Sequence, residues 1–352
     1  MKKTDAIVLF SGGLDSILCA KMLLAQNLSV LCLHFSSPFF GNPEKIPLWE
    51  ERYGLSIEHK DVSKAFVQIL KKPRFGYGKR LNPCVDCKIL LLASARAVLE
   101  EKGASILATG EVLGQRPMSQ RSDCLNRIAR EANVTDVLLR PLSAQLLPET
   151  RFEKQGLIDR SRLAGIAGRG RSQQLRLAHD FGIDDIPMPN GGCSLTEEEN
   201  ARRYWPVLTL EPHAGPLDFL LTHAGRQFWQ KRDGQSFWLT IGRHERDNAK
   251  LQNSMQEDDA LLSFPAIPSP LAIARHGASW PKECLLSGAS LALSYAVRAI
   301  AQNPIQTVRV LTRDGAWETS CTADRGGEWT LPPWESVSCE LHKLKKTNSE
   351  AS

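Results

Sequence analysis

The sequence has no long apolar run. None of its stretches approaches the roughly 20 consecutive apolar residues that a membrane-spanning helix needs, which argues against an integral membrane protein. Residues 1–5 lead directly into an apolar segment, so there is no room for a signal peptide. We therefore expect a cytoplasmic protein, in which the nine cysteines are thiols, metal ligands or catalysts rather than disulfide partners.

Neither sign of charge dominates. The net charge is +5, and the apolar and charged contents of 42% and 24% are those of an ordinary globular protein. A length of 352 residues predicts two domains. The basic excess lies in the first, because residues 1–195 hold 27 Lys and Arg against 20 Asp and Glu, and the remainder holds 17 against 19. This predicts either a polyanionic partner for the first domain or a basic face exposed to solvent.

Two common phosphate-binding patterns are also missing, the Walker A loop and the dinucleotide pattern Gly-x-Gly-x-x-Gly. The chain has instead Ser11-Gly12-Gly13-Leu14-Asp15-Ser16, between the apolar run 6–9 and the amphipathic run 17–24. This order predicts a strand, a tight glycine turn and a helix. Two glycines allow the backbone to approach an anion closely, and the N–H groups and the dipole of the helix then favour binding of that anion. The stretch is predicted to hold phosphate, the alternative being a generic glycine turn.

Alternating strands and helices follow this loop. The expected strands are 28–35, 56–60 and 104–109, and the expected helices are 64–71 and 89–102. Such alternation predicts an α/β domain with a doubly wound, mostly parallel sheet. Ligands of such sheets bind at the carboxyl ends of the strands, where the glycine turn, His34 and Thr109-Gly110 all fall.

A second domain is expected after a linker at 211–216. The divisions predicted are a first domain at 1–210, a smaller α+β domain at 216–340 and a disordered tail at 341–352. The expected strands of the second domain are 237–241, 260–264, 271–274 and 307–311, with a helix at 285–300. Two further features are a basic stretch at 151–176, interpreted as a mobile arm or a solvated helix pair, and a turn-rich loop at 187–193.

Cysteines form the second strong pattern. Cys84-x-x-Cys87-Lys88 precedes a helical run, where the helix dipole is expected to lower thiol pKa values. Cys193, in its glycine-rich loop, is the natural third member. Three cysteines suit a 4Fe–4S cluster with one open iron, or a persulfide nucleophile with a resolving partner and a bystander. The remaining six are expected to be small buried apolar residues: Cys19, Cys32, Cys124, Cys284, Cys321 and Cys339.

Four segments in order resemble a known family. They are the loop 11–16, the segment 33–39, Cys84-x-x-Cys87-Lys88, and 109–120 followed by Leu139-Arg140-Pro141-Leu142. The first is similar to the PP-loop of ATP pyrophosphatases of the adenine nucleotide α-hydrolase-like fold. All four together resemble the PP-loop domain of the tRNA 4-thiouridine synthetase family (ThiI), with the thiouridylase MnmA as a more distant relative. The family's preceding THUMP region and its rhodanese domain are not seen in this sequence.

The resemblance implies an ATP-dependent tRNA sulfurtransferase. ATP would adenylate a uridine carbonyl oxygen, and sulfur from the cysteine site would displace AMP. The sulfur donor would be a cysteine desulfurase, a sulfur carrier or inorganic sulfide. The alternatives are a PP-loop ligase that transfers no sulfur, acting on tRNA or a small molecule, and a non-enzymatic RNA-binding scaffold.

Site roles follow from the same resemblance. The catalytic residues would be Cys84, Cys87, Cys193 and Asp15, with the three cysteines also the metal ligands of a cluster. The ATP phosphates would be held by Ser11, Gly12, Gly13, Asp15 and Ser16, with Asp15 acting through Mg²⁺. Adenosine would lie at His34 and Ser36, although a hydrogen-bonded histidine at the strand end is the alternative for His34. The nucleotide or base pocket would be lined by Gly110, Gln115 and Ser119. The flanking cations Arg74, Lys79, Arg80 and Lys88 would contact RNA phosphates or remain solvated.

The second domain resembles, more weakly, the RNA-binding NFACT-R module. The segments that carry this likeness are 242–251, 268–275 and 287–292. The resemblance implies RNA contacts by Arg243, Arg246, Lys250 and Arg275. The near-neutral charge of this half opposes a strong electrostatic grip, and a domain that only buttresses the first is the alternative.

Overall fold

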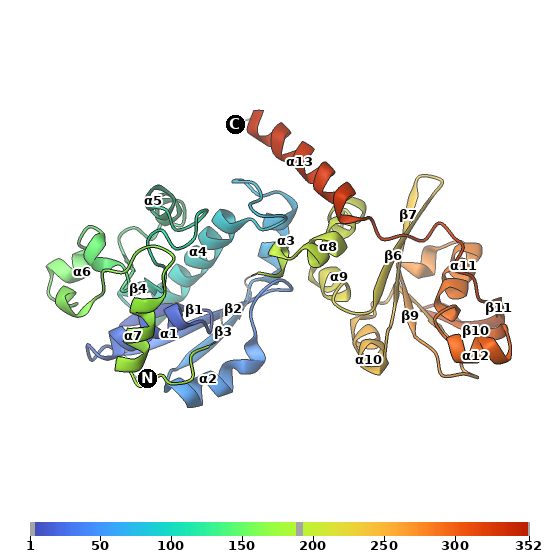
Figure 1. Cartoon of the computed structure of the whole chain (residues 1–352), viewed down its shortest axis with the longest axis horizontal. Helices are drawn as coiled ribbons and strands as arrows, with labels where there is room; N and C mark the ends of the chain where they lie inside the picture. The colour runs from blue at the N-terminus through green and yellow to red at the C-terminus, as the bar shows by residue number, and fades with distance from the viewer. Residues whose placement is uncertain (1–3, 188–192, 351–352) are drawn as a thin grey trace. The chain divides into compact units, whose positions relative to one another are not determined.

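The computed structural model describes residues 4–187 and 193–350, and it divides into two units, Met1–Thr196 and Glu197–Ser352 (Figure 1). The division falls earlier in the chain than the sequence-based boundary at 210, so helix α8 (Glu198–Leu210) belongs to the second unit. Most of the turn-rich loop expected at 187–193 lies outside the described residues. Each unit is treated by itself below.

The first unit is an α/β layer structure, as predicted. Its five strands form a wholly parallel sheet in the order β3-β2-β1-β4-β5. The strands are β1 Ala6–Phe10, β2 Val30–Ser36, β3 Ile57–Asp61, β4 Ile106–Thr109 and β5 Leu138–Leu139. The flanking helices are α1 Leu14–Leu24, α2 Ile46–Tyr53, α3 Ser63–Lys71, α4 Cys84–Lys102, α5 Ser122–Glu131, α6 Arg151–Lys154 and α7 Ser172–Asp180.

The sheet brings the candidate residues together at the carboxyl ends of its strands. Strand β1 is apolar and buried throughout, as expected for a central strand of a parallel sheet. It pairs with β2 and β4, so that Phe10 lies opposite His34 and Leu9 opposite Thr109. The order of the strands reverses at β1, which is where ligands bind in open α/β sheets. The glycine turn, His34 and Gly110 therefore meet at the carboxyl edge, as the sequence predicts.

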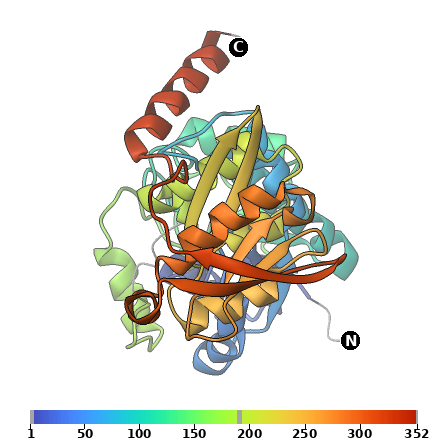
Figure 2. The same ribbon diagram turned by 90° about the vertical axis from the view of Figure 1, so that its right-hand side faces the viewer.

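The second unit is built on an antiparallel sheet of six strands in the order β11-β10-β8-β9-β7-β6. Figure 2 shows β10 and β11 as a long paired ribbon in orange to red. The strands are β6 Arg226–Arg232, β7 Gln235–Ile241, β8 Ala260–Ser263, β9 Ala272–Arg275, β10 Ile305–Thr312 and β11 Gly315–Thr322. The helices besides α8 are α9 Pro216–Leu221, α10 Glu245–Ser254, α11 Lys282–Leu293, α12 Val297–Gln302 and α13 Trp334–Glu350. A smaller α+β domain is thus confirmed.

Three details differ from the sequence-based expectations. The single helix expected at 285–300 is two helices, because the chain turns between Leu293 and Val297. The tail expected to be disordered from residue 341 continues helix α13 as far as Glu350. Strands β6 and β11 were not predicted. Among the helices in the described parts of the chain, none has the length and apolar character needed to cross a membrane.

Candidate active site at the phosphate loop

The turn after β1 is stabilised by its own serines. The Ser16 hydroxyl donates to the Gly13 carbonyl oxygen at 2.7 Å and accepts the Ser11 N–H at 3.2 Å. Gly12 has a φ of +77°, and a Cβ there would lie 2.3 Å from the Trp49 ring, so only glycine fits. The N–H groups of Ser16 and Ile17 donate to the Gly13 carbonyl oxygen at 3.0 and 3.2 Å, which leaves those of Leu14 and Asp15, at the very start of α1, for an anion. The loop has the form of a phosphate cradle.

Asp15 carries a buried carboxylate oxygen that lacks a donor. Its Oδ2 accepts a hydrogen bond from Gln115 Nε2 at 3.1 Å, while its Oδ1 is buried without a hydrogen-bond partner. Leaving such an atom unsatisfied is unfavourable, and a carboxylate oxygen is a preferred ligand of Mg²⁺. Asp15 beside the cradle therefore fits the Mg²⁺ that accompanies a nucleotide triphosphate.

Gly110 has a packing role at this edge. A Cβ at Gly110 would lie 2.4 Å from the Asp15 carbonyl oxygen, so the end of β4 approaches the first turn of α1 as closely as backbones can. This contact fixes α1 against the sheet. Gly110 thereby positions Asp15, whereas the resemblance placed it in the lining of the nucleotide or base pocket.

His34 is occupied by the protein itself. Its Nδ1 lies 3.0 Å from the Phe10 carbonyl oxygen, which requires a proton on Nδ1, and its Nε2 accepts the Asn42 N–H at 3.0 Å. Burial lowers the pKa of His34 and keeps it neutral. Neither ring nitrogen is left to hydrogen-bond adenosine, which agrees with the alternative of a hydrogen-bonded histidine at the strand end, while the adenosine role stays a prediction. The second predicted residue, Ser36, hydrogen-bonds His59 Nε2 at 2.7 Å.

The two cysteines open helix α4, but their pKa values are not lowered. Burial raises the pKa of Cys87 to about 12 and also raises that of Cys84. The expectation that the helix dipole would lower both was wrong, because desolvation outweighs it. Cys84 is the more readily ionised of the two. The charges of Arg116 and Lys88 and a hydrogen bond donated by Asn82 Nδ2 at 2.9 Å all favour its thiolate.

Asp86, between the cysteines, holds the preceding loop. Its buried carboxylate accepts the N–H groups of Arg74 and Phe75, both at 3.0 Å. The Arg74 side chain extends to Glu131 on α5. Arg80 has a φ of +60° and donates from its guanidinium to the Thr196 carbonyl oxygen at 2.6 Å. Arg74 and Arg80 thus have partners within this unit, and Lys79 is exposed.

The segment that follows the third cysteine lies beside this loop. Leu81 donates its N–H to the Leu195 carbonyl oxygen at 3.3 Å, and Ser194 donates to that of Phe39 at 2.9 Å. Nevertheless, in residues 4–187 and 193–350 no three His, Cys, Asp or Glu side chains are grouped so as to hold a metal ion. In the described residues, Cys84, Cys87 and Cys193 therefore do not form the ligand set of a 4Fe–4S cluster.

A buried charge cluster links the cysteine helix to the sheet edge. Glu111, directly after Gly110, is 2% exposed and lies 3.4 Å from Lys88 Nζ and 3.2 Å from Arg140 Nε. Although burial opposes its ionisation, these two cations and the Thr109 hydroxyl hold the pKa of Glu111 below its usual value. Lys88 is therefore an ion-pair partner of Glu111, and its contact with RNA stays a prediction. The pairing joins three distant stretches of sequence, so sequence reasoning missed Glu111.

Replacing Glu111 with Gln should destabilise the first unit by about 1–3 kcal/mol, because it leaves the partly buried charges of Lys88 and Arg140 without their counterion. The measurement is the thermal midpoint of unfolding, with Glu101→Gln on the exposed end of α4 as the control. Since the folded pKa of Glu111 is depressed, its contribution is present above the unfolded carboxyl pKa and lost as pH falls through the folded value. A midpoint for E111Q equal to that of E101Q would contradict the role of this cluster.

One loop joins the two halves of the site. Gln115 donates to Asp15, and the next residue, Arg116, places its charge near Cys84. The loop is fixed on its other side, because the Gly168 N–H donates to the Leu113 carbonyl oxygen at 2.7 Å. Ser119 nearby is only 3% exposed, which leaves little of it to line an open pocket. The phosphate loop and the cysteines thus share one short connecting loop.

The basic stretch 151–176 is anchored to the unit. Arg162 donates to the Ala25 carbonyl oxygen, and the Asp159 N–H donates to Gln26 Oε1 at 2.8 Å, both at the far end of α1 from the phosphate loop. Arg160 pairs with Glu153 at 2.6 Å. These contacts contradict the interpretation as a mobile arm.

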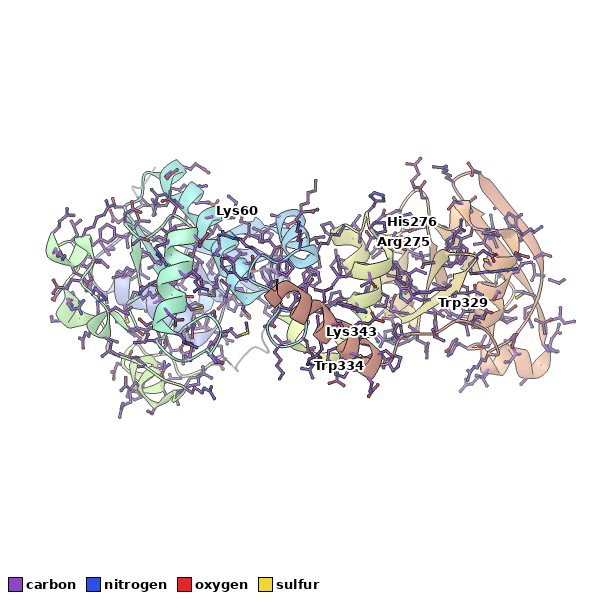
Figure 3. The ribbon with its side chains drawn as sticks, turned by 90° about the horizontal axis from the view of Figure 1, so that it is seen from above. Lys60, Arg275, His276, Trp329, Trp334 and Lys343 are labelled. Atoms are coloured by element: carbon purple, nitrogen blue, oxygen red, sulfur yellow. The ribbon has the colours of Figure 1, made fainter. Side chains whose placement is uncertain are left out.

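In the second unit, the four predicted RNA contacts have different surroundings. Figure 3 labels Arg275, at the end of β9. The residue is 1% exposed, and its side chain pairs with Asp218 and with Asp259, the latter at 2.6 Å. Its assignment as an RNA contact was wrong, because its guanidinium is enclosed. Arg243 pairs with Asp247 at 2.6 Å. Arg246 and Lys250 are exposed on α10.

Comparisons with known proteins agree with the geometry of the first unit. Residues 2–145 match the family model described as "Thiamine biosynthesis protein (ThiI)". A "tRNA-specific 2-thiouridylase MnmA" of Nitratidesulfovibrio vulgaris is 30% identical over 68% of this chain and 70% of its own. The chain belongs to the PP-loop group of ThiI and MnmA. A "Probable tRNA sulfurtransferase" of Methanothermobacter thermautotrophicus is 26% identical over 53% of this chain, which spans 43% of that relative's length.

Two solved structures are similar over part of the chain. One is a predicted subunit of a tRNA methyltransferase from Methanocaldococcus jannaschii, with a TM-score of 0.30 and 19% identity over 39% of this chain and 69% of its own. The other is the C-terminal part of a fibronectin/fibrinogen-binding protein from Streptococcus suis, with a TM-score of 0.24 and 11% identity over 68% of this chain and 87% of its own. Membership of the PP-loop group rests on the sequence relatives, and the fold of each unit rests on its own sheet.

Proposed function

We propose that this protein is an ATP-dependent tRNA sulfurtransferase that replaces a uridine carbonyl oxygen with sulfur. The observation that carries the proposal is the 113–116 loop, in which Gln115 contacts Asp15 of the phosphate loop and Arg116 acts on Cys84. This loop supports the proposal because it links the residues proposed to activate ATP with the cysteine proposed to carry sulfur, within the same unit. The printed names of the relatives, a tRNA sulfurtransferase and a tRNA thiouridylase, agree with this pairing.

In the first proposed step the phosphate loop binds ATP and Asp15 holds its Mg²⁺. The uridine carbonyl oxygen attacks the α-phosphorus, and the bond from that phosphorus to the bridging oxygen breaks, so that pyrophosphate leaves. The loop N–H groups at the start of α1 stabilise the charge on the phosphates. Adenylation gives the carbonyl carbon a leaving group that a neutral carbonyl lacks.

In the second proposed step a persulfide on Cys84 supplies the sulfur. Its terminal sulfur attacks the activated carbon, the carbon–oxygen bond breaks, and AMP leaves with that oxygen. The thiolate of a second cysteine of the three then attacks the Cys84 sulfur, which leaves a thiocarbonyl on the base and a disulfide on the protein. A thiol reductant must reduce that disulfide, and a sulfur donor must restore the persulfide. Arg116 and Lys88 favour the Cys84 thiolate, which we therefore assign as the sulfur carrier.

The test follows both products. The full chain is incubated with Mg²⁺-ATP, bulk tRNA, a thiol reductant, and a cysteine desulfurase with its cysteine substrate, whose persulfide supplies sulfane sulfur to Cys84. Pyrophosphate is then quantified and the digested nucleosides are analysed by mass spectrometry. We expect one thiouridine for each pyrophosphate released. Pyrophosphate release with a different modified nucleoside would favour a PP-loop ligase. If neither pyrophosphate nor a modified nucleoside forms, the result contradicts an enzymatic role with these substrates.

We further propose that the second unit helps to bind tRNA, as the NFACT-R resemblance implies. Arg246 and Lys250 are exposed on α10, so they are the two residues of the original four best placed to contact phosphates. Replacing both with Gln should weaken tRNA binding and lower the salt slope of log K by about two, since about one counterion is released per phosphate contact. The measurement is tRNA affinity at several salt concentrations, with Lys64→Gln and Lys72→Gln, at two exposed lysines, as a control for lost charge. An unchanged slope would contradict this role for α10.

A further inference from the structure

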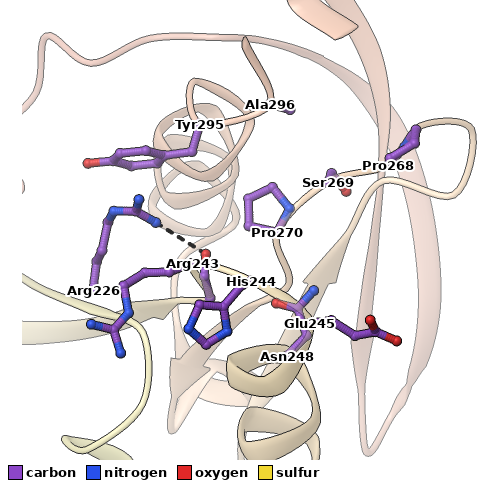
Figure 4. Close-up of a pocket in the computed structure, with 11 residues that line it drawn as sticks. Arg226, Arg243, His244, Glu245, Asn248, Pro268, Ser269, Pro270, Tyr295 and Ala296 are labelled. Carbon is purple, nitrogen blue, oxygen red and sulfur yellow. Dashed lines mark hydrogen bonds between the residues drawn. The ribbon is translucent and has the colours of Figure 1, made fainter. Parts of the chain in front are cut away.

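The second unit contains a cavity that none of the proposed steps uses. It measures about 290 Å³, at the lower end of the range typical of small-molecule sites. The start of β6, the first turn of α10, the 268–270 segment and the end of α11 surround it (Figure 4). Its lining residues include Arg226, Arg243, His244, Asn248, Pro270 and Tyr295.

Arg226 is fixed against an aromatic ring on one wall of this cavity. Its guanidinium carbon lies 4.4 Å from the centroid of the Tyr295 ring, and its NH1 donates to the Gly242 carbonyl oxygen at 3.3 Å (Figure 4). The other N–H groups of Arg226 have no acceptor in the part of the chain that the structure describes. A guanidinium supported in this way can stack on a nucleobase and bind a phosphate through two donors at once.

A second arginine near the Tyr295 ring, Arg325, already forms hydrogen bonds within the protein. Arg325 lies 4.7 Å from the Tyr295 centroid, but it donates both to the hydroxyl and to the carbonyl oxygen of Ser294. Tyr295 thus supports Arg226 while Arg325 anchors the ring. Arg226 is the member of this group with donors left for a ligand.

The floor of the cavity is rigid. A Cβ at Gly242 would lie 2.0 Å from Asn248 Oδ1, and that oxygen accepts the Leu271 N–H at 3.2 Å. The backbone of Gly242 is therefore pressed against α10, and a larger residue there would displace Asn248. A prearranged floor lowers the entropic cost of binding.

The charges around the cavity nearly cancel. Arg243 is neutralised by Asp247, and Glu245 on the rim points away from Arg226 (Figure 4). A polyphosphate would find too little positive charge here. One phosphate on Arg226 and one stacked base suit the site better, and this also agrees with the near-neutral charge of this half of the sequence.

We propose that this cavity binds one unpaired nucleotide of an RNA strand, with its base stacked on the Arg226–Tyr295 pair and its phosphate on Arg226. The nucleotide must be unpaired because both faces of a base are covered within a duplex. This inference rests on the proposed RNA partner and adds a stacking site to the exposed cations of α10. On this proposal the second unit binds single-stranded RNA.

The experiment measures the binding of a fluorescent single-stranded oligouridylate to the full chain by anisotropy. Tyr295→Leu and Arg226→Gln should each weaken binding about tenfold, since stacking contributes ~1–3 kcal/mol per base. Tyr295→Phe keeps the ring and should bind as the unaltered protein does. Lys231→Gln removes an exposed charge from the same strand, β6, and should have little effect.

Equal affinity of Y295L, R226Q and the unaltered protein would overturn the assignment. So would equal binding of a duplex of the same length. Displacement of the strand by free UMP as effectively as by unlabelled oligonucleotide would identify a mononucleotide site and overturn the RNA assignment. Pyrophosphate release and thiolation are assayed in parallel. If the unaltered protein thiolates tRNA while Y295L and R226Q bind the oligouridylate normally, the cavity assignment alone fails. If the unaltered protein neither binds nor modifies tRNA, the proposed function fails.

Discussion

Asp15→Asn should abolish the release of pyrophosphate from ATP while leaving the protein at least as stable as before. The rate should fall about 10²–10³-fold, because metal-assisted charge stabilisation contributes several kcal/mol and each 1.36 kcal/mol is a factor of ten. Stability should not fall, since Asp15 Oδ1 has no hydrogen-bond partner in the described part of the chain, and the remaining amide oxygen of an asparagine can still accept the hydrogen bond that Gln115 donates. A loss of activity together with a retained or raised thermal midpoint is the signature of a group kept for its ligand.

The control for D15N is Asp123→Asn, which alters an exposed carboxylate paired with Arg121 on the same unit. It should change neither pyrophosphate release nor the midpoint. Full pyrophosphate release by D15N would remove Asp15 from the mechanism. A large fall in its thermal midpoint would show instead that the carboxylate is a structural group.

Cys84→Ser should separate the two proposed steps. Thiouridine formation should be lost, because a serine hydroxyl can carry no persulfide, whereas ATP-dependent pyrophosphate release should stay within about threefold of the original rate. The hydrogen bond from Asn82 can be kept by the serine oxygen, so the start of α4 should remain in place. Nucleoside mass spectrometry and pyrophosphate release, measured on the same samples, check the expectation.

Cys339→Ser, at an exposed cysteine in α13, is the matched control and should thiolate normally. Thiolation by C84S would rule out Cys84 as the carrier. The visible spectrum of protein purified without oxygen separates the two sulfur chemistries. Because the described thiols are not gathered as cluster ligands, we expect no broad absorption of a cysteine-ligated iron–sulfur cluster. Brown protein that bleaches in C84S would restore the cluster mechanism.

Local patterns predicted the first unit well. Apolar runs marked β1 and β2, and the glycine turn marked the start of α1, because each signal lies within a few residues. In the second unit the patterning is weaker. Strand β6 reads Arg-Gln-Phe-Trp-Gln-Lys-Arg and β11 is largely exposed, so neither shows the clean apolar alternation of a half-buried strand. Strand β6 is stabilised by its hydrogen bonds to β7, and β11 by its hydrogen bonds to β10, rather than by a local apolar pattern.

The chemistry of single residues was harder to predict. The sequence placed His34 correctly near the end of a strand. Its hydrogen-bond partners are the Phe10 carbonyl oxygen, which accepts from it, and the Asn42 N–H, which donates to it, and no spacing rule connects these residues. Arg275 looked like a surface cation, although the run Ala272-Ile273-Ala274 before it carried the signal of a fully buried strand. The thiol pKa values depend on desolvation, a property of everything packed around α4 rather than of the Cys-x-x-Cys pattern.

Trp49, whose ring stands against Gly12, has a consequence for spectroscopy. It is the sole tryptophan among residues 1–196, while the other seven fall between residues 205 and 334. The tryptophan fluorescence of the first unit therefore comes from one indole placed beside the phosphate loop. Changing the other seven tryptophans to phenylalanine would leave a chain whose tryptophan fluorescence reports on a single turn of backbone, with no label attached.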